Sequence, residues 1–261
     1  METTDEVSTR LTAKVIAEVN ADIIGVVEAE DRPSLLRFNR DLVGRYRQVM
    51  LVDGNDDRGV DVGLMTKTGL DILNIRSHVD DEDDTGLVFS RDCPDYEVQI
   101  PGSEPLHVLV NHFKSQSGGG GAKRARQAIR LREIVDDLVA AGQRAVVFGD
   151  FNEGQADEAT PAANFAPLFD PQGPLVVCYD LPGFDDGPRP GTFDSCGIRN
   201  RLDYIFVTKD LVPAVSGGGI FRKGLWGSRA TRPTAWDTFP EMTSGSQQAS
   251  DHAALFLDPR L

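Results

Sequence analysis

The sequence contains no long apolar segment and few cysteines. No run approaches the ~18 consecutive apolar residues of a membrane-spanning helix, and the opening METTDEVSTR is acidic, unlike the basic and then apolar start of a signal peptide. The three cysteines, Cys93, Cys178 and Cys196, lack the C-x-x-C spacing of a zinc site. The sequence therefore indicates no membrane protein, disulfide scaffold or zinc domain. One bridge between Cys178 and Cys196 stays open, as does the compartment, either cytoplasmic or secreted after removal of a leader.

Positive charge is also scarce. The 27 Lys and Arg residues face 41 Asp and Glu residues, which gives a formal net charge of -14. Such a surface repels polyanions unless basic groups gather locally, and a broad nucleic-acid-coating role is therefore disfavoured. Hydrophobic residues make up 40% of the 261 residues, which is enough for a substantial core.

The pattern of apolar residues predicts one α/β domain. Helical spacing predicts a helix over 8–20 that leads directly into a buried strand over 22–27. Further strands are predicted over 46–52, 60–66, 70–77, 96–100, 106–110, 145–148, 202–207 and 253–257, and helices over 33–43 and 122–141. No composition break divides residues 1–261, so we predict a single domain. Many strands with few helices favour two sheets packed face to face with helices outside.

The sharpest local feature is VVFGDFN at 146–152. This apolar strand ends in Gly149 and then presents Asp150 and Asn152, an acid and an amide two residues apart on the same side. A carboxylate and a carboxamide held at a strand end suit a hard cation, or a water beside a phosphate. The alternative is a simple turn after a strand.

Three other apolar strands have ionisable groups at their ends. The strand over 22–28 ends in Glu28, and Asp251 and His252 precede the strand over 253–257. The strand over 108–114 ends with Asn111, His112 and Lys114. Paired carboxylates, two imidazoles and an amide are what metal-assisted hydrolysis of a phosphoester requires. Four such strand ends therefore predict one shared site.

Asp203 lies in RLDYIFV at 201–207, between apolar neighbours. A carboxylate at a buried position needs a partner, because burial without one is costly. His252 is the candidate partner, and Arg201 is the alternative.

These motifs, in this order, resemble those of the endonuclease/exonuclease/phosphatase superfamily, which has the deoxyribonuclease-like fold. The matching pieces are DIIGVVEAE with Glu28, NHFKS at 111–115, GDFN at 149–152, RLDYIFV at 201–207 and SDH at 250–252, along residues 8–258. RGVDVGLM at 58–65 and FSRDC at 89–93 resemble less invariant strands of bacterial members. The resemblance implies a four-layer α/β sandwich, in which two mixed β-sheets pack face to face between helices and the site lies at the sheet edges.

The resemblance also implies catalytic roles for five residues. Asp150 would position or deprotonate the attacking water, and Asn152 would hold the phosphate or that water. His252 would donate to a phosphate oxygen, oriented by Asp203. His112 would be the second imidazole on the phosphate side.

Metal-binding and substrate-binding roles follow from the same resemblance. Glu28 would bind the divalent metal, usually Mg²⁺ with Mn²⁺ as a substitute, and Asp251 would complete the metal environment. Asp57 would orient His112. The implied substrate-binding residues are Arg91, Asn111 and Lys114.

The implied reaction is in-line attack of water on a phosphodiester or phosphomonoester, without a covalent enzyme intermediate. A nuclease-type substrate is our first interpretation, with nucleic acid as the candidate partner. The alternatives are a phospholipid or inositol phosphate substrate, or a non-catalytic binding descendant of the fold. A basic run over 123–132 could steer a phosphate-bearing substrate, although a helix face paired with Glu133, Asp136 and Asp137 is the commoner case.

One family feature has no counterpart in this sequence. Family members open with an inner strand that carries an Asn-x-Asn-like element, whereas METTDEVSTR already leads into the first helix. A shortened chain, a strand supplied by a partner chain and a degenerate protein are the three explanations. Loss of an inner strand uncovers sheet edges, so we expect lowered stability or self-association through that edge, and weaker metal binding.

Overall fold

A six-stranded mixed sheet forms one layer of the fold. The structure is a computed structural model that describes residues 6–157, 160, 162–227 and 235–261. The strand order is β10-β12-β9-β8-β7-β4. The bounds are β4 Ile72–Arg76, β7 Asp95–Val98, β8 Leu106–His112, β9 Arg144–Asp150, β10 Leu175–Val177 and β12 Asp203–Thr208. Only β8 and β9 run parallel among these neighbours.

The second layer consists of two separate three-stranded sheets. One has the order β1-β3-β2 and the other the order β11-β13-β14. Their bounds are β1 Ile23–Ala29, β2 Gln48–Val52, β3 Asp61–Thr66, β11 Phe184–Asp185, β13 Val215–Phe221 and β14 Ala254–Pro259. A small hairpin pairs β5 Glu82–Asp83 with β6 Gly86–Leu87. Within the described residues, β1 and β14 each have a strand on one side only.

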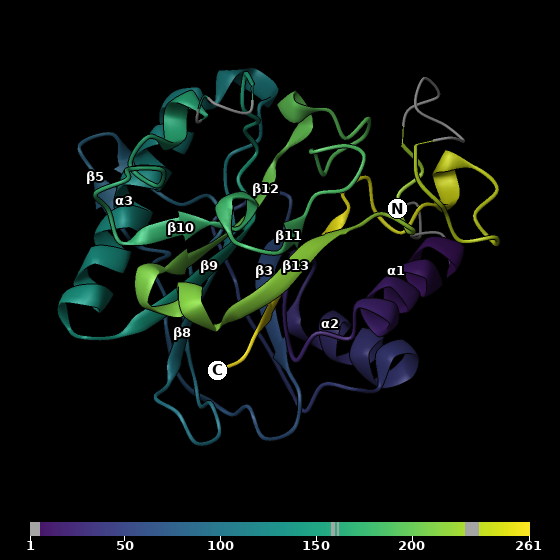
Figure 1. Ribbon diagram of the computed structural model, residues 1–261, viewed down its shortest axis with the longest axis horizontal. Coiled ribbons are helices and arrows are strands. Elements are labelled where there is room, and N and C mark those ends of the chain that lie inside the picture. Colours follow the sequence, from purple (N-terminus) through teal and green to yellow (C-terminus); the bar gives the residue numbers. More distant parts are fainter. Residues whose placement is uncertain (1–5, 158–159, 161, 228–234) are drawn as a thin grey trace.

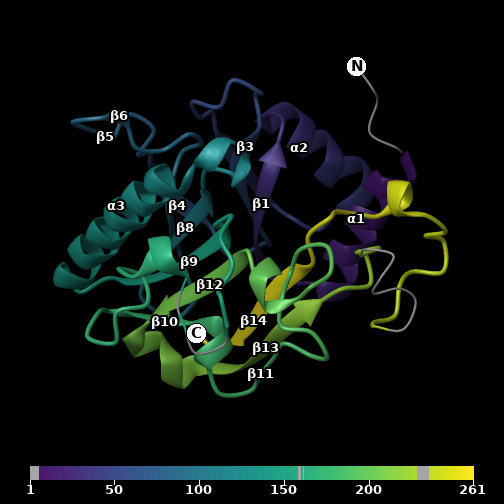
Figure 2. The same ribbon diagram turned by 90° about the horizontal axis from the view of Figure 1, so that it is seen from above.

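Helices cover the outer faces of both layers. The views in Figure 1 and Figure 2 place α3 (Gly121–Ala140) on one side, and α1 (Glu6–Val19) and α2 (Arg32–Phe38) on the other. A π-helical turn, Asn39–Val43, continues α2. The 3-10 helices are Ser117–Gly119, Ala163–Phe165, Cys178–Asp180, Ile198–Asn200, Lys209–Ala214 and Gly245–Gln247. In the part of the chain that the structure describes, no helix has the length and apolar character needed to cross a membrane.

The predicted α/β sandwich is confirmed, and the predicted helices and strands are present with shifted ends. The second layer differs from a continuous sheet, because its two halves share no strand pairing. The sequence prediction missed β13, whose segment VSGGGIF has the glycines of a loop. A Cβ on Gly218 would lie 2.6 Å from Leu257 Cδ2, so close packing against β14 explains that glycine. The cysteines are free and buried, so Cys178 and Cys196 form no bridge.

A cluster of aromatic rings anchors the strand ends that carry the candidate site. Phe113 directly follows β8, Phe151 directly follows β9, and both are fully buried. Their ring centroids lie 4.7 Å apart, and Phe165 packs edge-on against both. Large buried aromatic rings supply much of the packing energy of a core. The cluster therefore fixes the polar residues immediately before each ring.

Candidate active site

Three neighbouring strands place three predicted site residues in one row. His112 at the end of β8 is aligned with Asp150 at the end of β9, and Asp150 is aligned with Asp203 at the start of β12. Side chains at aligned positions of neighbouring strands point to the same face of a sheet. The register of the six-stranded sheet therefore brings together residues that are far apart in the sequence.

The GDFN turn holds Asp150 by its backbone geometry. Gly149 has a φ of 143°, and a Cβ there would lie 1.8 Å from the carbonyl oxygen of Asn111, so only glycine fits. Asn152 has a φ of 56°, and its backbone N–H donates to Asp150 Oδ1 at 2.7 Å. Its side-chain amide donates to Asp150 Oδ2 at 2.9 Å and to the carbonyl oxygen of Phe113 at 3.1 Å. The turn predicted as an alternative is present, and it serves to fix the carboxylate.

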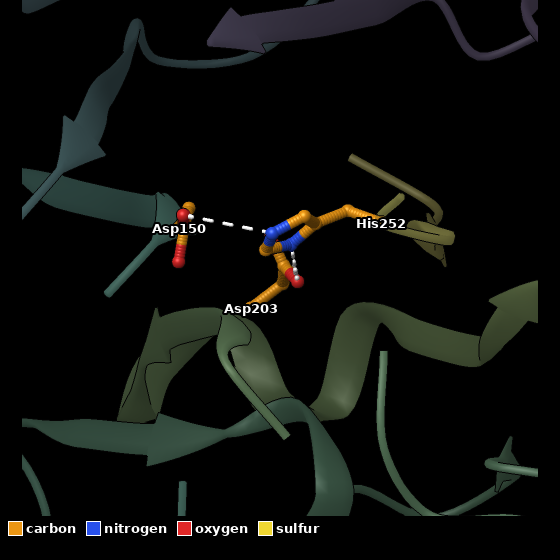
Figure 3. A group of neighbouring side chains, drawn as sticks. All are labelled: Asp150, Asp203 and His252. Atoms are coloured by element: carbon orange, nitrogen blue, oxygen red, sulfur yellow. Dashed lines mark hydrogen bonds and ion pairs between the residues drawn. The ribbon is translucent and has the colours of Figure 1, made fainter. Parts of the chain in front are cut away.

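His252 reaches this row from the other layer, just before β14. Its Nδ1 donates to Asp203 Oδ2 at 2.8 Å, and its Nε2 lies 3.9 Å from Asp150 Oδ2 (Figure 3). His112 Nε2 lies 3.5 Å from the same Asp150 oxygen. Two imidazoles therefore face one carboxylate. The alternative partner of Asp203, Arg201, instead binds Gln155, Asp186 and the carbonyl oxygen of Pro190.

The pKa values of Asp150 and His252 are shifted away from the ordinary values of these side chains. Burial, together with the nearby Asp203 carboxylate, raises the pKa of Asp150 to about 7, against the opposing effect of the His252 charge. Burial alone would lower the pKa of His252, but the attraction and hydrogen bond of Asp203 raise it to about 10. At neutral pH His252 is a cation beside a carboxylate that is close to its titration midpoint. Opposed shifts in neighbouring groups are typical of acid–base sites.

A buried guanidinium adds positive charge beside His112. Arg91 is 2% exposed, and its Nη2 lies 2.9 Å from Asp56 Oδ2. Burial and the charges of Arg91 and Arg58 lower the pKa of His112 to about 3, so this imidazole is neutral. Asp57 was the predicted partner of His112, but the carboxylate whose charge acts on His112 is the adjacent Asp56, which pairs with Arg58 and Arg91. The His112 Nδ1 is buried without a hydrogen-bond partner among the described residues.

Glu28 projects from an irregularity at the end of β1. The β1–β3 register shifts between Val26 and Ala29, and Glu28 has a φ of 59°. A non-glycine residue in this region carries strain, and such strain is concentrated at functional sites. The Glu28 carboxylate is 57% exposed and lies 3.9 Å from Arg58 Nη2. Its charge contributes to the raised pKa of Asp150, after burial and Asp203, so the two carboxylates lie within electrostatic reach.

Three other predicted site residues, Asn111, Asp251 and Lys114, differ in how far they are buried and in what they contact. Asn111 is 1% exposed and donates to the carbonyl oxygen of Leu109 at 3.4 Å. Because neighbours on a strand face opposite sides, Asn111 is not brought together with His112. Asp251 is exposed. Burial lowers the pKa of His252, and the charge of Asp251 helps to raise it, after the larger effects of Asp203 and Asp150. Lys114 is half-buried, and no ion pair of its ammonium group is found within the described residues.

The sequence analysis missed three neighbours of the site. The sequence analysis gave Asp56 and Arg58 no role, although Arg58 is the first residue of the RGVDVGLM motif and Asp56 lies two residues before it. The ring of Phe193 lies 4.9 Å from that of His252, and the two residues form an isolated β-bridge. A single phenylalanine in a loop carries no sequence signal for such a role.

The donor chemistry of the site fits a divalent cation. Asp150, Asp203 and His252 offer ligand atoms within 4.8 Å of one another, which makes a candidate metal site of acids and a histidine. A metal-bound imidazole must be neutral, whereas His252 is held as a cation by Asp203. The carboxylate oxygens of Glu28 and Asp251 are possible metal ligands, and they accept no hydrogen bond from any described residue. These two carboxylates suit a hard cation such as Mg²⁺.

The basic run on α3 is largely neutralised by acids. Arg130 pairs with Glu133 and Asp81, and Arg132 pairs with Asp136. Arg124 and Arg126 pair with Glu153 and Asp83 respectively. The prediction of a paired helix face is therefore confirmed for Glu133 and Asp136.

Comparisons with known proteins identify the family and the fold of the chain. A family model described as the endonuclease/exonuclease/phosphatase family matches residues 3–252. Truncated TDP2 from Caenorhabditis elegans has a TM-score of 0.66 at 16% identity, with 97% of this chain and 91% of that chain covered. A mannosyl-6-phosphatase of Bacteroides thetaiotaomicron VPI-5482 has a TM-score of 0.64 at 18% identity, covering 82% and 80%. The human Nocturnin catalytic domain with bound sulfate has a TM-score of 0.60 at 18% identity, covering 78% and 76%.

The search of curated proteins finds no match. At the identities above, the structural likeness concerns the fold, while the family match rests on the sequence itself. Together they confirm the resemblance inferred from the strand-end motifs. The chain belongs to the endonuclease/exonuclease/phosphatase family and has its phosphoesterase fold.

Proposed function

We propose that this protein is a metal-dependent phosphoesterase that hydrolyses a phosphodiester of nuclease type with an activated water. One observation supports this most strongly. A single buried carboxylate, Asp150, lies 3.5 Å from His112 and 3.9 Å from His252, while Asp203 holds His252 as a cation. A base and a fixed cation within a few ångströms of each other suit attack of water on a phosphate group.

The roles of the residues follow from their charges. Asp150 takes the proton of the attacking water, because its raised pKa makes it a stronger base than an ordinary carboxylate. His252 donates from Nε2 to a non-bridging phosphate oxygen, and Asp203 keeps the ring oriented and charged. Asn152 fixes the Asp150 carboxylate. The neutral His112 offers a second hydrogen bond on the phosphate side, and Arg91 and Lys114 supply positive charge.

Glu28 and Asp251 would hold Mg²⁺, or Mn²⁺ in its place. A bound divalent cation supplies Lewis-acid stabilisation of negative charge on the phosphate. The net charge of -14 and the paired arginines of α3 favour a small or single-stranded substrate over a wrapped duplex. The likeness to a mannosyl-6-phosphatase brings phosphomonoesters into consideration as the second substrate class.

Activity on a panel of substrates tests the proposal. The purified chain is incubated with a chromogenic bis-aryl phosphodiester, plasmid DNA, single-stranded DNA, RNA, a sugar phosphate, a phospholipid and an inositol phosphate, each with Mg²⁺, Mn²⁺ or EDTA. We expect metal-dependent turnover of the aryl phosphodiester and of at least one nucleic acid. Turnover of the monoester alone would replace the nuclease-type assignment by a phosphatase. Equal turnover in EDTA would refute the metal-dependent mechanism.

The pH dependence of the reaction follows from two shifted groups. Asp150 acts as a base only when ionised, and its pKa is raised to about 7, so kcat/KM is expected to rise as pH increases through about 7. His252 acts only when protonated, and its pKa is raised to about 10, so kcat/KM is expected to fall above about pH 10. A bound cation stabilises the ionised carboxylate, and higher Mg²⁺ concentration should therefore move the acid limb to lower pH. A profile with its maximum below pH 6 would contradict these assignments.

Replacing Glu28 by Gln should weaken metal activation selectively. The variant replaces one negatively charged oxygen ligand by a neutral amide. We expect the half-activating Mg²⁺ concentration to rise by about 10–100-fold, with little change in kcat at saturating metal. Titration calorimetry with Mn²⁺ alone provides a readout that does not depend on turnover. The matched control is Glu30→Gln, an exposed glutamate two residues further along the chain. Equal metal affinity in the two variants would exclude Glu28 as a ligand.

A further inference from the structure

Two lysines lie close together on the phosphate side of the candidate site. Lys114 follows His112 by two residues, and Lys123 lies in the first turn of α3. The side chain of Lys114 lies against the loop that leads into α3, since a Cβ on Gly120 would be 2.6 Å from Lys114 Cγ. Arg124 Nη1 donates to the carbonyl oxygen of Lys114 at 3.1 Å. This hydrogen bond ties Lys114 to the turn of α3 that carries Lys123.

Backbone hydrogen bonds fix this segment to the active site. The carbonyl oxygen of Phe113 accepts a hydrogen bond from the Asn152 side-chain amide at 3.1 Å and another from Arg91 Nη1 at 3.4 Å. The N–H of Phe113 donates to the carbonyl oxygen of Asp150 at 2.9 Å. Lys114 is the next residue along the chain, so its position is set by the same turn that holds the Asp150 carboxylate.

Neither lysine forms an ion pair with an acid among the residues whose placement the structure gives. The arginines of α3, in contrast, all bind acids. The charge of Asp83 acts on Lys123, but both oxygens of that carboxylate accept hydrogen bonds from Arg126. The chain has 41 acids for 27 Lys and Arg residues. Two neighbouring ammonium groups without an acid are therefore unusual in this protein.

The positive charges around Lys123 oppose one another. Burial, and then the charges of Arg126, Lys114 and Arg91, lower the pKa of Lys123. Arg91 also lies within electrostatic reach of Asp150, so this group of cations adjoins the reacting carboxylate. Cations that are held close together repel each other until an anion binds among them. The arrangement therefore favours binding of an anion beside the active site.

We propose that Lys114 and Lys123 form a second phosphate site, which binds the phosphate adjacent to the scissile one in a single nucleotide strand. This inference rests on the proposed function and names its substrate as a single-stranded oligonucleotide with at least two phosphates. A lysine ammonium group binds phosphate as a point charge, so the pair recognises charge rather than base sequence. With a net charge of -14 the protein repels polyanions elsewhere, and a strand needs such a local site in order to bind.

The second phosphate site lies outside the cavity at the active site. That cavity has a volume of about 900 Å³, and its walls include Asp150, Asp203 and His252 together with residues of β1 and β14, but neither lysine. Residues 116–119, between the two lysines in the chain, are exposed, and two of them are glycines. A strand with its scissile phosphate at Asp150 can place the next phosphate on the lysines and continue over this loop. A compact inositol polyphosphate would leave the loop unused, so we favour the strand.

Three short substrates test the second phosphate site by turnover with Mg²⁺. The dinucleotide TpT has one phosphate, while pTpT and TpTp carry a further phosphate on the 5′ or the 3′ side. We expect one of the two longer substrates to have a KM about tenfold below that of TpT, because it gains a charge-assisted contact. Lys123→Gln should remove most of this advantage. Lys209→Gln makes the same change in net charge at an exposed position and should keep it. Equal KM values for the three substrates would overturn the proposal.

Binding without turnover separates this inference from the proposed function. Fluorescein-labelled oligo-dT is titrated in EDTA over a series of salt concentrations, and binding is measured by anisotropy. Each phosphate contact with a single strand contributes about -0.7 to the slope of log K against log salt, so the double variant Lys114→Gln/Lys123→Gln should have a slope shallower by about 1.4. Lys209→Gln should keep the slope of the parent.

The outcomes distinguish the two claims. A slope that the double variant leaves unchanged would overturn the second phosphate site, even if the protein hydrolyses phosphodiesters. A shallower slope without hydrolysis of any substrate would support the site and refute the proposed function. Tighter binding of inositol hexakisphosphate than of oligo-dT, with the same dependence on the two lysines, would overturn the assignment to a nucleotide strand.

Discussion

Replacing Asp150 by Asn is expected to lower kcat/KM on a phosphodiester by about 10³–10⁴-fold, at the upper end of what general base catalysis contributes. The amide keeps the size of the side chain, and its oxygen can still accept the 2.7 Å hydrogen bond from the Asn152 backbone N–H. It cannot take a proton from water. The loss should therefore appear in kcat at saturating substrate and saturating Mg²⁺.

The same variant should not lose stability, which separates a catalytic effect from misfolding. The folded protein raises the pKa of Asp150 to about 7, so ionisation opposes folding once the pH exceeds the ordinary carboxylate value. A neutral Asn removes this opposition, which offsets the loss of the hydrogen bond that the Asn152 side-chain amide donates to Asp150 Oδ2, so the temperature of thermal unfolding at pH 8 should change little. Asp137→Asn, on the exposed face of α3, is the matched control and should change neither activity nor Tm. A kcat/KM within threefold of the parent would remove Asp150 from the mechanism.

The strand ends were predictable because period-2 patterns and Gly or Asp boundaries report local structure. The motif around Asp150 combines an apolar strand, a glycine required by the close approach of Asn111 and an Asx-type turn, all encoded within seven consecutive residues. The partnership of Asp203 with His252 was also predictable, because a buried acid requires a partner. These inferences depend on neighbours in sequence or on a general cost of burial.

Features that depend on packing between distant segments were not accessible in the same way. The sequence VSGGGIF of β13 is a poor strand by propensity, and its place between β11 and β14 is decided by tertiary contacts. The choice of Asp56 rather than Asp57 beside Arg91 depends on one residue of loop geometry. Only coordinates give the volume and walls of the cavity that residues of β1 and β14 line.

Replacing His252 by Ala is expected to lower kcat/KM by about 10²–10³-fold, the usual cost of losing one charged donor to a developing oxyanion. Asp203→Asn removes the group that holds the pKa of His252 near 10, so it should cost less activity but move the alkaline limb of the pH profile to lower pH. The double variant should be about as slow as His252→Ala alone, because Asp203 acts through the imidazole.

A second Asp–His pair in the protein supplies the control for this prediction. His107 Nδ1 lies 2.8 Å from Asp95 Oδ1, the same separation as in the His252–Asp203 pair, but this pair is buried between β7 and β8 and does not line the cavity at the active site. His107→Gln should therefore affect Tm without moving either limb of the pH profile. If His252→Ala retained the alkaline limb near pH 10, another group would have to be the cation, and the positioning role of Asp203 would be wrong.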